Sequence, residues 1–299
     1  MKLHRAAQCL MFFVFIIFFL SCNENLVIEI PGFSDKIVVE AYICQNSNEA
    51  IISLTKTISP YKRRDYADTS LKVRGAKVKI YLDREEFLMQ EDTSMIYMGV
   101  YGPTYMSSSV QRYLISNVRF DNIMSCGLYV DYGDFHLEAE EHFPKEVRIQ
   151  NVHDTIVSRI PSGNKYPVRY LSMNITADFP KNESSYYRVS QVTDYVVPNS
   201  SNHLYITESE YFCHKSNDST HFTEIKLRYG NLGYKINKVI LYLDHITKNY
   251  YDFEKALKAQ EENDDSPFGS EGTQIPTNIK NGLGIFTCYS RDSVCLDIK

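Results

Sequence analysis

The chain has 299 residues, of which 43% are hydrophobic and 23% are charged, so it is long enough for one large domain or two ordinary ones. Its formal net charge of -5 argues against a nucleic-acid-binding protein, because such a protein needs a basic surface. Tyrosine is abundant at 23 residues, and tryptophan is absent. Since tyrosine and β-branched residues suit pleated, half-buried surfaces, the composition favours β structure.

The first predicted element is a lipoprotein signal peptide over residues 1–21. Lys2 and Arg5 form a short basic start, and Ala6–Leu20 is an almost unbroken apolar stretch. This stretch of about 15 residues is too short for a bilayer core, which needs roughly 20 helical residues. Its length and its basic start are typical of the apolar core of a signal peptide.

Cys22 follows the small residue Ser21 at the end of this stretch, and that placement is typical of bacterial lipoproteins. We expect Cys22 to receive a diacylglycerol, to become the first residue after cleavage and to carry acyl chains such as palmitate. An ordinary cleaved signal peptide is the alternative, because Phe19 occupies a position where leucine is commoner. A membrane-spanning anchor would need a longer stretch followed by basic residues, whereas Asn23-Glu24-Asn25 follows here.

Residues 22–34 are predicted to form a lipidated tether, and residues 35–148 an N-terminal β-sandwich domain. In this domain, apolar and polar residues alternate at the two-residue period of β-strands. Its predicted strands are Lys36–Ile43, Ala50–Thr57, Gly75–Leu82, Val110–Val118, Leu128–Tyr132 and Phe135–Glu140. The dipeptide Gly133-Asp134 predicts a tight hairpin turn between the last two strands.

Residues 149–299 are predicted to form a C-terminal β-sandwich domain with one amphipathic helix at about 247–262. The helix has Tyr250, Phe253 and Leu257 on one face and charged residues opposite. The predicted strands of this part are Val147–Ile160, Tyr166–Ala177, Ser185–Val197, Phe222–Arg228 and Lys235–Leu243. The expected fold is therefore mainly β, with two tandem sandwiches of immunoglobulin-like or transthyretin-like type.

Five cysteines remain after removal of the signal peptide and acylation of Cys22: Cys44, Cys126, Cys213, Cys288 and Cys295. An odd number leaves at least one free thiol unless chains are cross-linked. If Arg291-Asp292 forms the tip of a hairpin, Cys288 and Cys295 face each other, and a disulfide between them is possible. Two separate buried thiols are the alternative. The spacing of the cysteines predicts no zinc site.

The sequence contains no recognisable catalytic motif of the nucleophile-elbow, zinc-protease or phosphate-loop type. Cys213-His214 with His221 is the nearest approach to a metal cluster, but its spacing fits no standard site. The polar residues around it predict an exposed loop. We therefore expect no enzymatic activity, no catalytic residue, no bound metal and no cofactor.

Several segments resemble one protein family in the same order along the chain. They are VVEAYI (38–43), GAKVKIY (75–81), YVDYGDFHLEAEEHFP (129–144), DFPKNESSYYRV (178–189) and SPFGSEGTQIPTNIKNGLGIF (266–286). The sequence is similar to outer-membrane lipoproteins of Bacteroidetes that are catalogued as domain of unknown function 4249. In that family a Gly or aromatic stretch often follows the last segment. Here Thr287-Cys288 follows instead, so a Cys288–Cys295 disulfide has no support from the resemblance.

The resemblance implies a lipid-anchored protein of the outer membrane, on its surface or its periplasmic face. Members are often encoded beside a TonB-dependent transporter, so we expect an accessory binding or scaffolding component of such a transport system. The expected partners are that transporter and the membrane, reached through the lipid anchor. The alternative is a structural fimbrial or adhesin-type surface lipoprotein. The resemblance carries over no catalytic residue.

Overall fold

The computed structural model describes residues 34–58, 69–93, 96–99, 102–105, 110–159, 168–180, 184–196, 203–214, 220–227, 235–264 and 274–296. Most of these residues lie in β-strands, and helix α2 (Lys248–Asp264) follows them late in the chain. The mainly β fold and the late helix, predicted at about 247–262, are confirmed. The predicted signal peptide, Cys22 and the tether up to residue 33 lie outside the described residues. No helix in the described part of the chain is long and apolar enough to cross a membrane.

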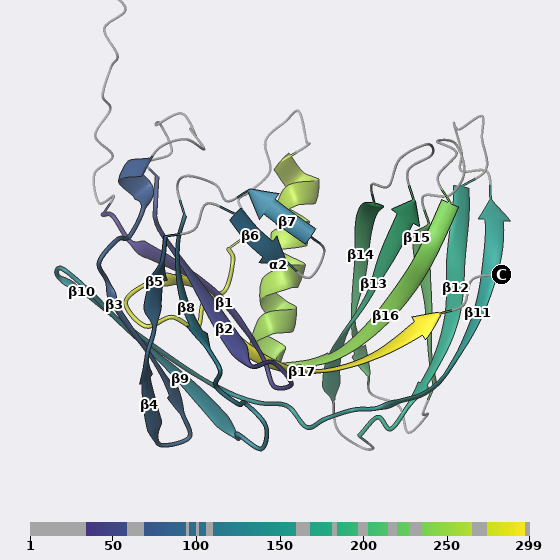
Figure 1. The fold of residues 1–299 in the computed structure, drawn as a ribbon, viewed down its shortest axis with the longest axis horizontal. Helices are drawn as coiled ribbons and strands as arrows, with labels where there is room; N and C mark the ends of the chain where they lie inside the picture. The colour runs from purple at the N-terminus through teal and green to yellow at the C-terminus, as the bar shows by residue number, and fades with distance from the viewer. Residues whose placement is uncertain are drawn as a thin grey trace, which may run out of the picture. The chain divides into compact units, whose positions relative to one another are not determined.

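The largest sheet runs through most of the described chain (Figure 1). Its strands, in order across the sheet, are β14 (His203–His214), β13 (Ser185–Val196), β16 (Lys235–Ile246), β17 (Leu283–Leu296), β1 (Ile37–Cys44), β2 (Glu49–Lys56), β8 (Gln111–Ser116) and β5 (Gln90–Asp92). The 3-10 helix η1 (Thr69–Leu71) precedes β3 in the chain.

Three smaller sheets accompany it. Their strands, in order, are β10 (Phe135–His142), β9 (Ser125–Tyr132), β3 (Lys77–Leu82) and β4 (Glu85–Leu88) in the first; β11 (Ile149–Arg159), β12 (Val168–Ala177) and β15 (Thr220–Leu227) in the second; and β6 (Ile96–Gly99) and β7 (Gly102–Tyr105) in the third. The predicted turn at Gly133-Asp134 is confirmed, because Tyr132 pairs with Phe135 and Gly133 has a φ of 59°.

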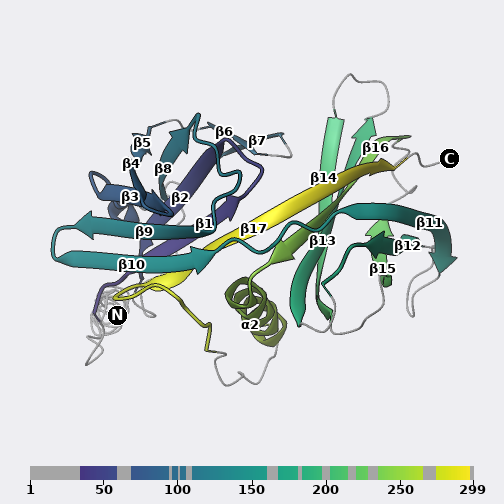
Figure 2. The same cartoon turned by 90° about the horizontal axis from the view of Figure 1, so that it is seen from below.

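Strand β17 is the central strand of the large sheet. It pairs in parallel with β1 and antiparallel with β16, so one strand joins elements from both ends of the chain (Figure 2). Its side chains alternate between two faces of the sheet, and Phe286 and Cys288 point into one apolar core, while Leu296 belongs to another. The predicted division of the chain at 148/149 stays a prediction, and β17 carries residues of both cores.

The first core lies between the β17–β1–β2–β8 part of the large sheet and the four-stranded sheet, and it contains Val39, Ile52, Ile80 and Val130. The second contains Met173 and Ile175 of β12 with residues of β13 and β16. Such two-layer packing is the sandwich arrangement that the alternating sequence pattern predicts. A third, aromatic cluster is formed by Tyr250 of α2 with Ile246 and Tyr289.

Two local predictions are wrong. Cys213-His214, expected in an exposed loop, ends the 12-residue strand β14. The expected hairpin at Arg291-Asp292 is not formed, because β17 continues through both residues as far as Leu296. Both segments carry polar residues that usually mark loops, but strand pairing on at least one side keeps each of them extended.

Gly284 of β17 lies close to the backbone of β1. Its φ is +97°, a conformation that residues with a side chain rarely adopt. A Cβ atom placed on Gly284 would lie 1.9 Å from the Val39 carbonyl oxygen of β1. Only glycine therefore allows this register between β1 and β17, the first and last described strands along the chain.

We predict that Gly284→Ala lowers the free energy of unfolding by about 2–5 kcal/mol, because it adds a backbone clash to the cost of a positive φ. Gly133→Ala is the matched control, since Gly133 also has a positive φ, but a Cβ atom placed there would meet nothing within 4 Å. The control should lose about 1–2 kcal/mol from the positive φ alone. Urea denaturation followed by circular dichroism measures both. Equal losses would show that the β1–β17 approach is not tight.

Candidate functional site

A row of three charged side chains crosses neighbouring strands of the large sheet. Asp244 of β16 pairs in register with Arg188 of β13 on one side and Arg291 of β17 on the other. Asp244 is fully buried. Arg188 Nε donates to Asp244 Oδ2 at 2.7 Å, and Arg291 Nε donates to Asp244 Oδ1 at 2.6 Å. One carboxylate therefore accepts charged hydrogen bonds from two guanidinium groups.

Tyrosine rings surround this pair of arginines. Arg188 Nη1 donates to the Tyr250 hydroxyl of α2 at 2.5 Å, and its guanidinium lies 5.4 Å from the centroid of that ring. The Arg291 guanidinium lies 4.6 Å from the Tyr242 ring centroid and 5.2 Å from that of Tyr289. These distances allow cation–π attraction, which partly replaces the water that the buried guanidinium groups have lost.

Glu254 of α2 contributes a second carboxylate near this charged row. Burial raises the pKa of Glu254, whereas a hydrogen bond from Tyr211 and the positive charge of Arg188 lower it. Tyr42 of β1 also donates to Glu254 Oε1, at 3.5 Å. When Glu254 is ionised, its charge and that of Asp244 balance the charges of the two arginines. Helix α2 therefore supplies one of the four charges.

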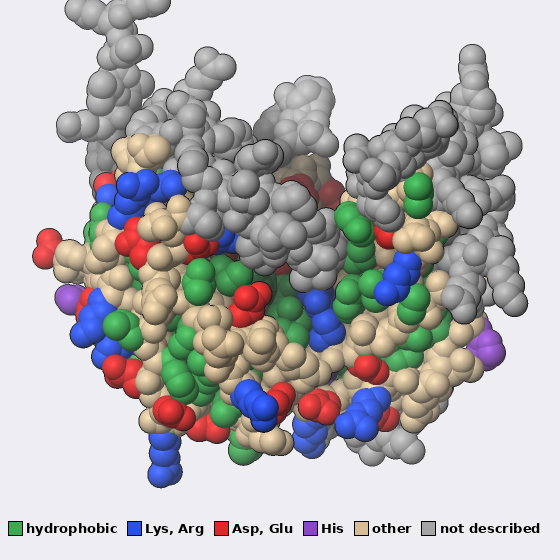
Figure 3. Space-filling model, viewed as in Figure 1, with side chains coloured by type: hydrophobic (Ala, Val, Ile, Leu, Met, Phe, Trp, Pro, Cys, Tyr) green, Lys and Arg blue, Asp and Glu red, His purple; other side chains and the backbone are tan. Residues whose placement is uncertain are grey.

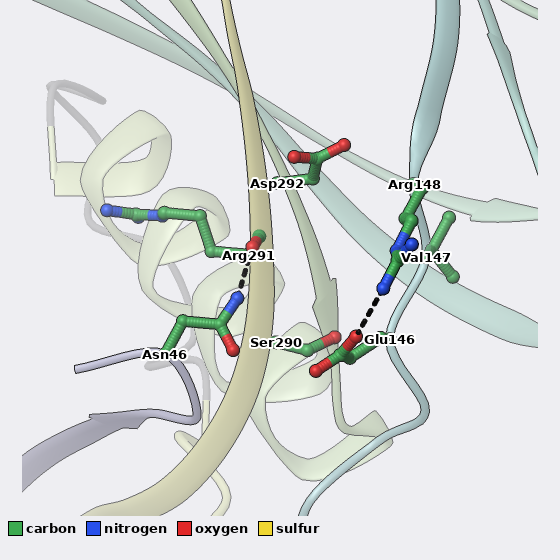
Figure 4. A pocket seen from close by; sticks show the side chains of 7 residues that line it. All are labelled: Asn46, Glu146, Val147, Arg148, Ser290, Arg291 and Asp292. Carbon is green, nitrogen blue, oxygen red and sulfur yellow. Dashed lines mark hydrogen bonds and ion pairs between the residues drawn. The ribbon is translucent and has the colours of Figure 1, made fainter. Parts of the chain in front are cut away.

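A cavity of about 280 Å³ lies on the opposite side of β17 from the Arg291 guanidinium (Figure 4). In Figure 4 the Arg291 side chain points away from Ser290 and Asp292, as expected for successive residues of a strand. The cavity is lined by Asn46, Glu146, Val147, Arg148, Ser290, Arg291 and Asp292.

The polar groups of this cavity hold backbone in place. Asp292 Oδ2 accepts from the Ile149 amide at 2.7 Å, and Ser290 Oγ donates to the Lys145 carbonyl at 3.1 Å. Asn46 Nδ2 donates to the Arg291 carbonyl at 2.9 Å. These bonds fasten the segment that leads into β11, and the β1–β2 turn, to the last strand. The cavity therefore lies where these segments of the chain meet β17. Its lining residues are not arranged as a catalytic nucleophile and base.

Two further hollows lie beside the charged row formed by Arg188, Asp244 and Arg291. One, of about 460 Å³, lies between β14 and α2 and is lined by Ser209, Glu210, Tyr211, Glu254, Lys255, Leu257, Lys258 and Glu261. The other, of about 1030 Å³, is shallow and is lined by Cys44, Asn46, Ser47, Asn48, Arg119, Asp121, Tyr289, Arg291, Asp292 and Ser293. Both have mixed charge and aromatic edges, which suit the binding of a polar surface. Within the described residues, no group of three or more His, Cys, Asp or Glu is placed to hold a metal ion.

A family model described as "Domain of unknown function (DUF4249)" matches residues 23–294. The chain belongs to this family. The match confirms the family resemblance seen in the sequence segments, and it covers all the strands and the helix described above up to Val294. A comparison with curated proteins finds no match.

Two predicted site residues of this family member, Cys288 and Cys295, lie on the same strand. Seven residues of extended chain separate their Cα atoms by roughly 24 Å, so the predicted Cys288–Cys295 disulfide is wrong for this structure. Cys288 is fully buried, Cys295 is exposed, and both are free thiols. The other predicted site residue, the lipid-attachment residue Cys22, lies outside the described residues.

The charged row formed by Arg188, Asp244 and Arg291 was not predicted from the sequence. One signal was present: Asp244 interrupts the apolar strand Val239–Ile246, and aspartate is depleted in strands. A charge at such a position indicates a buried partner. The partner could not be named from the sequence, because Arg188 and Arg291 lie 56 and 47 residues away.

We predict that Asp244→Asn lowers the free energy of unfolding by about 3–5 kcal/mol, because it leaves two buried guanidinium groups without their shared carboxylate. Asp252→Asn is the matched control. Asp252 pairs with Lys248 one turn away on the exposed side of α2, and its loss should cost at most about 0.5 kcal/mol. Urea denaturation at neutral pH measures both variants. If Asp244→Asn is as stable as the control, the row does not stabilise the fold.

Proposed function

We propose that this protein is a lipid-anchored lipoprotein of the outer membrane that has no enzymatic activity. On this proposal it acts as an accessory binding or scaffolding component of a TonB-dependent transport system. The observation that carries the proposal is the apolar stretch ending in Ser21-Cys22, followed at residue 23 by the start of the family match. The family match thus begins directly after the residue that would carry the lipid.

The described surface supports attachment by acyl chains. On the face shown in Figure 3, acidic and basic side chains are interspersed over the described residues. A surface of this kind gives little attraction to anionic lipid headgroups, which bind clusters of basic residues. Several acyl chains on one cysteine provide stable anchoring without such a cluster, because each buried methylene contributes about 0.8 kcal/mol.

The site geometry supports binding in preference to catalysis. The polar groups around β17 are used to hold neighbouring strands, the β1–β2 turn and the segment before β11. The two hollows beside the charged row, one of them lined partly by α2, have mixed charge and open outward, as in a surface that meets another protein. Exposed apolar side chains such as Met124, 77% exposed, and Leu88, 60% exposed, would add contact area in such a complex.

The alternative function, a fimbrial or adhesin-type subunit, requires a strand that can leave one chain and complete the sheet of another. The first described strand, β1, is paired on both edges, with β2 and with β17. Removing β1 would break both pairings and expose the first core. This position favours the accessory transport function over strand exchange.

We predict that Cys22→Ser abolishes lipidation, so that the protein leaves the outer-membrane fraction and retains its signal segment or is cleaved elsewhere. Cell fractionation, with mass spectrometry of the N-terminal peptide, measures the result. Cys295→Ser is the control, because this exposed thiol lies far along the chain from the anchor and should stay in the membrane fraction with the acylated N-terminus. Membrane association of Cys22→Ser with an unchanged mass would overturn the lipid anchor.

The transport role has its own test, which uses the lipidated protein. Cross-linking in intact cells followed by purification in mild detergent should recover a TonB-dependent transporter in near-stoichiometric amount. SDS-resistant ladders of the protein itself would support the fimbrial alternative instead. Recovery of a lone monomer after cross-linking would contradict both the transport function and the fimbrial alternative.

A further inference from the structure

Two cysteine thiols meet inside the first core. Cys126 lies on β9 of the four-stranded sheet, and Cys288 lies on β17 of the large sheet. Both side chains are fully buried and belong to the same apolar cluster. The Cys126 thiol lies close enough to the Cys288 thiol to interact with it. Burial raises the pKa of the Cys288 thiol, and the neighbouring Cys126 raises it further.

Strand periodicity explains why the thiols point toward each other. On β9 the buried residues Cys126, Leu128 and Val130 alternate with more exposed ones, so all three face the core. On β17, Phe286 and Cys288 face the same core from the opposing sheet. Pairing of Cys126 with Leu82 and of Cys288 with Ile43 fixes both positions within their sheets.

We propose that Cys126 and Cys288 form a disulfide that joins the two sheets of the first core. Bridges between the two sheets are a recurrent device of β-sandwiches. The proposal rests on the proposed location outside the cytoplasm, because disulfides persist in oxidising compartments. All five described cysteines are free thiols in the structure, and the proposed oxidation of Cys126 and Cys288 would leave three of them unpaired.

The oxidation requires a disulfide-bearing oxidoreductase of the cell envelope as electron acceptor. One cysteine thiolate attacks the disulfide of that enzyme and forms a mixed disulfide, and the second cysteine thiolate then displaces the enzyme. One S–S bond forms in the protein and one breaks in the enzyme. Two electrons pass to the enzyme, and the two protons lost by the cysteine thiols balance those taken up by its two sulfurs. Because both thiols are buried in the folded protein, the reaction takes place during folding, before the core closes.

The first experiment reads the bond directly. Cells that produce the full chain are treated with N-ethylmaleimide before lysis. The membrane protein is then purified, denatured in fresh N-ethylmaleimide so that buried thiols also react, and digested without reduction. The expected result is a linked peptide pair containing Cys126 and Cys288, with the other three described cysteines alkylated. Alkylation of both Cys126 and Cys288 in protein from the envelope would overturn the proposal.

The second experiment separates a bond from mere packing of two thiols. A reductant should lower the Tm of the purified protein by roughly 10 °C, because the bond closes a long loop. The Cys126→Ala/Cys288→Ala variant should show no reductant-dependent shift, whereas Cys295→Ala should keep the full shift. Because the bond would be buried in the folded state, the protein is unfolded and refolded in the reductant before the measurement. A Tm of the parent protein that this treatment leaves unchanged overturns the disulfide.

The proposed location and the proposed disulfide can be tested separately. If fractionation finds the protein in the envelope but both thiols are free, the location stands and the disulfide is wrong. If the protein is found in the cytoplasm, the proposed location is wrong, and the chain is then denatured, reduced and refolded in a glutathione redox buffer. Formation of the Cys126–Cys288 bond in that buffer supports the geometric inference, and its absence overturns it.

Discussion

The double pairing of β17 is the constraint on which the rest of the fold depends. This strand lies between β1 and β16, so the last described strand joins the first strand to the sheet of the second core. The parallel pairing with β1 needs a close backbone approach, which Gly284 allows. Because the strand is 14 residues long, its alternate side chains contribute to the first core, to the charged row and to the second core in turn.

The charged row shows how a central strand can carry an arginine. Arg291 and Arg188 are largely buried on either side of the fully buried Asp244, and the cost of removing these charges from water is offset only when every charge has a partner. Tyr250 and Glu254 of α2 supply the remaining hydroxyl and carboxylate. The helix is therefore positioned by polar contacts as well as by its apolar face.

Much of the fold could be predicted from local pattern. Strands such as β3 and β13, the turn at Gly133 and helix α2 follow from alternation, turn chemistry and helical periodicity, which depend on neighbouring residues. The continuity of β17 could not be predicted, because the dipeptide Arg291-Asp292 alone resembles a turn. Only the fold shows that Arg291 pairs with Asp244 and that Asp292 accepts from the Ile149 amide. The same long-range pairing decides which thiol faces Cys288, and spacing along the chain indicated Cys295 instead of Cys126.

The sheet order also limits what the predicted lipid anchor can do. Fourteen residues lie between Cys22 and the start of β1 at Ile37, so even a fully extended tether reaches at most about 50 Å. The tether leads directly into a strand that is held on both edges, and one of its neighbours is β17. A pull at the lipid end would therefore be opposed by two rows of backbone hydrogen bonds and by the first core. The length of the predicted tether therefore sets an upper limit on the distance between the lipid and the folded strands.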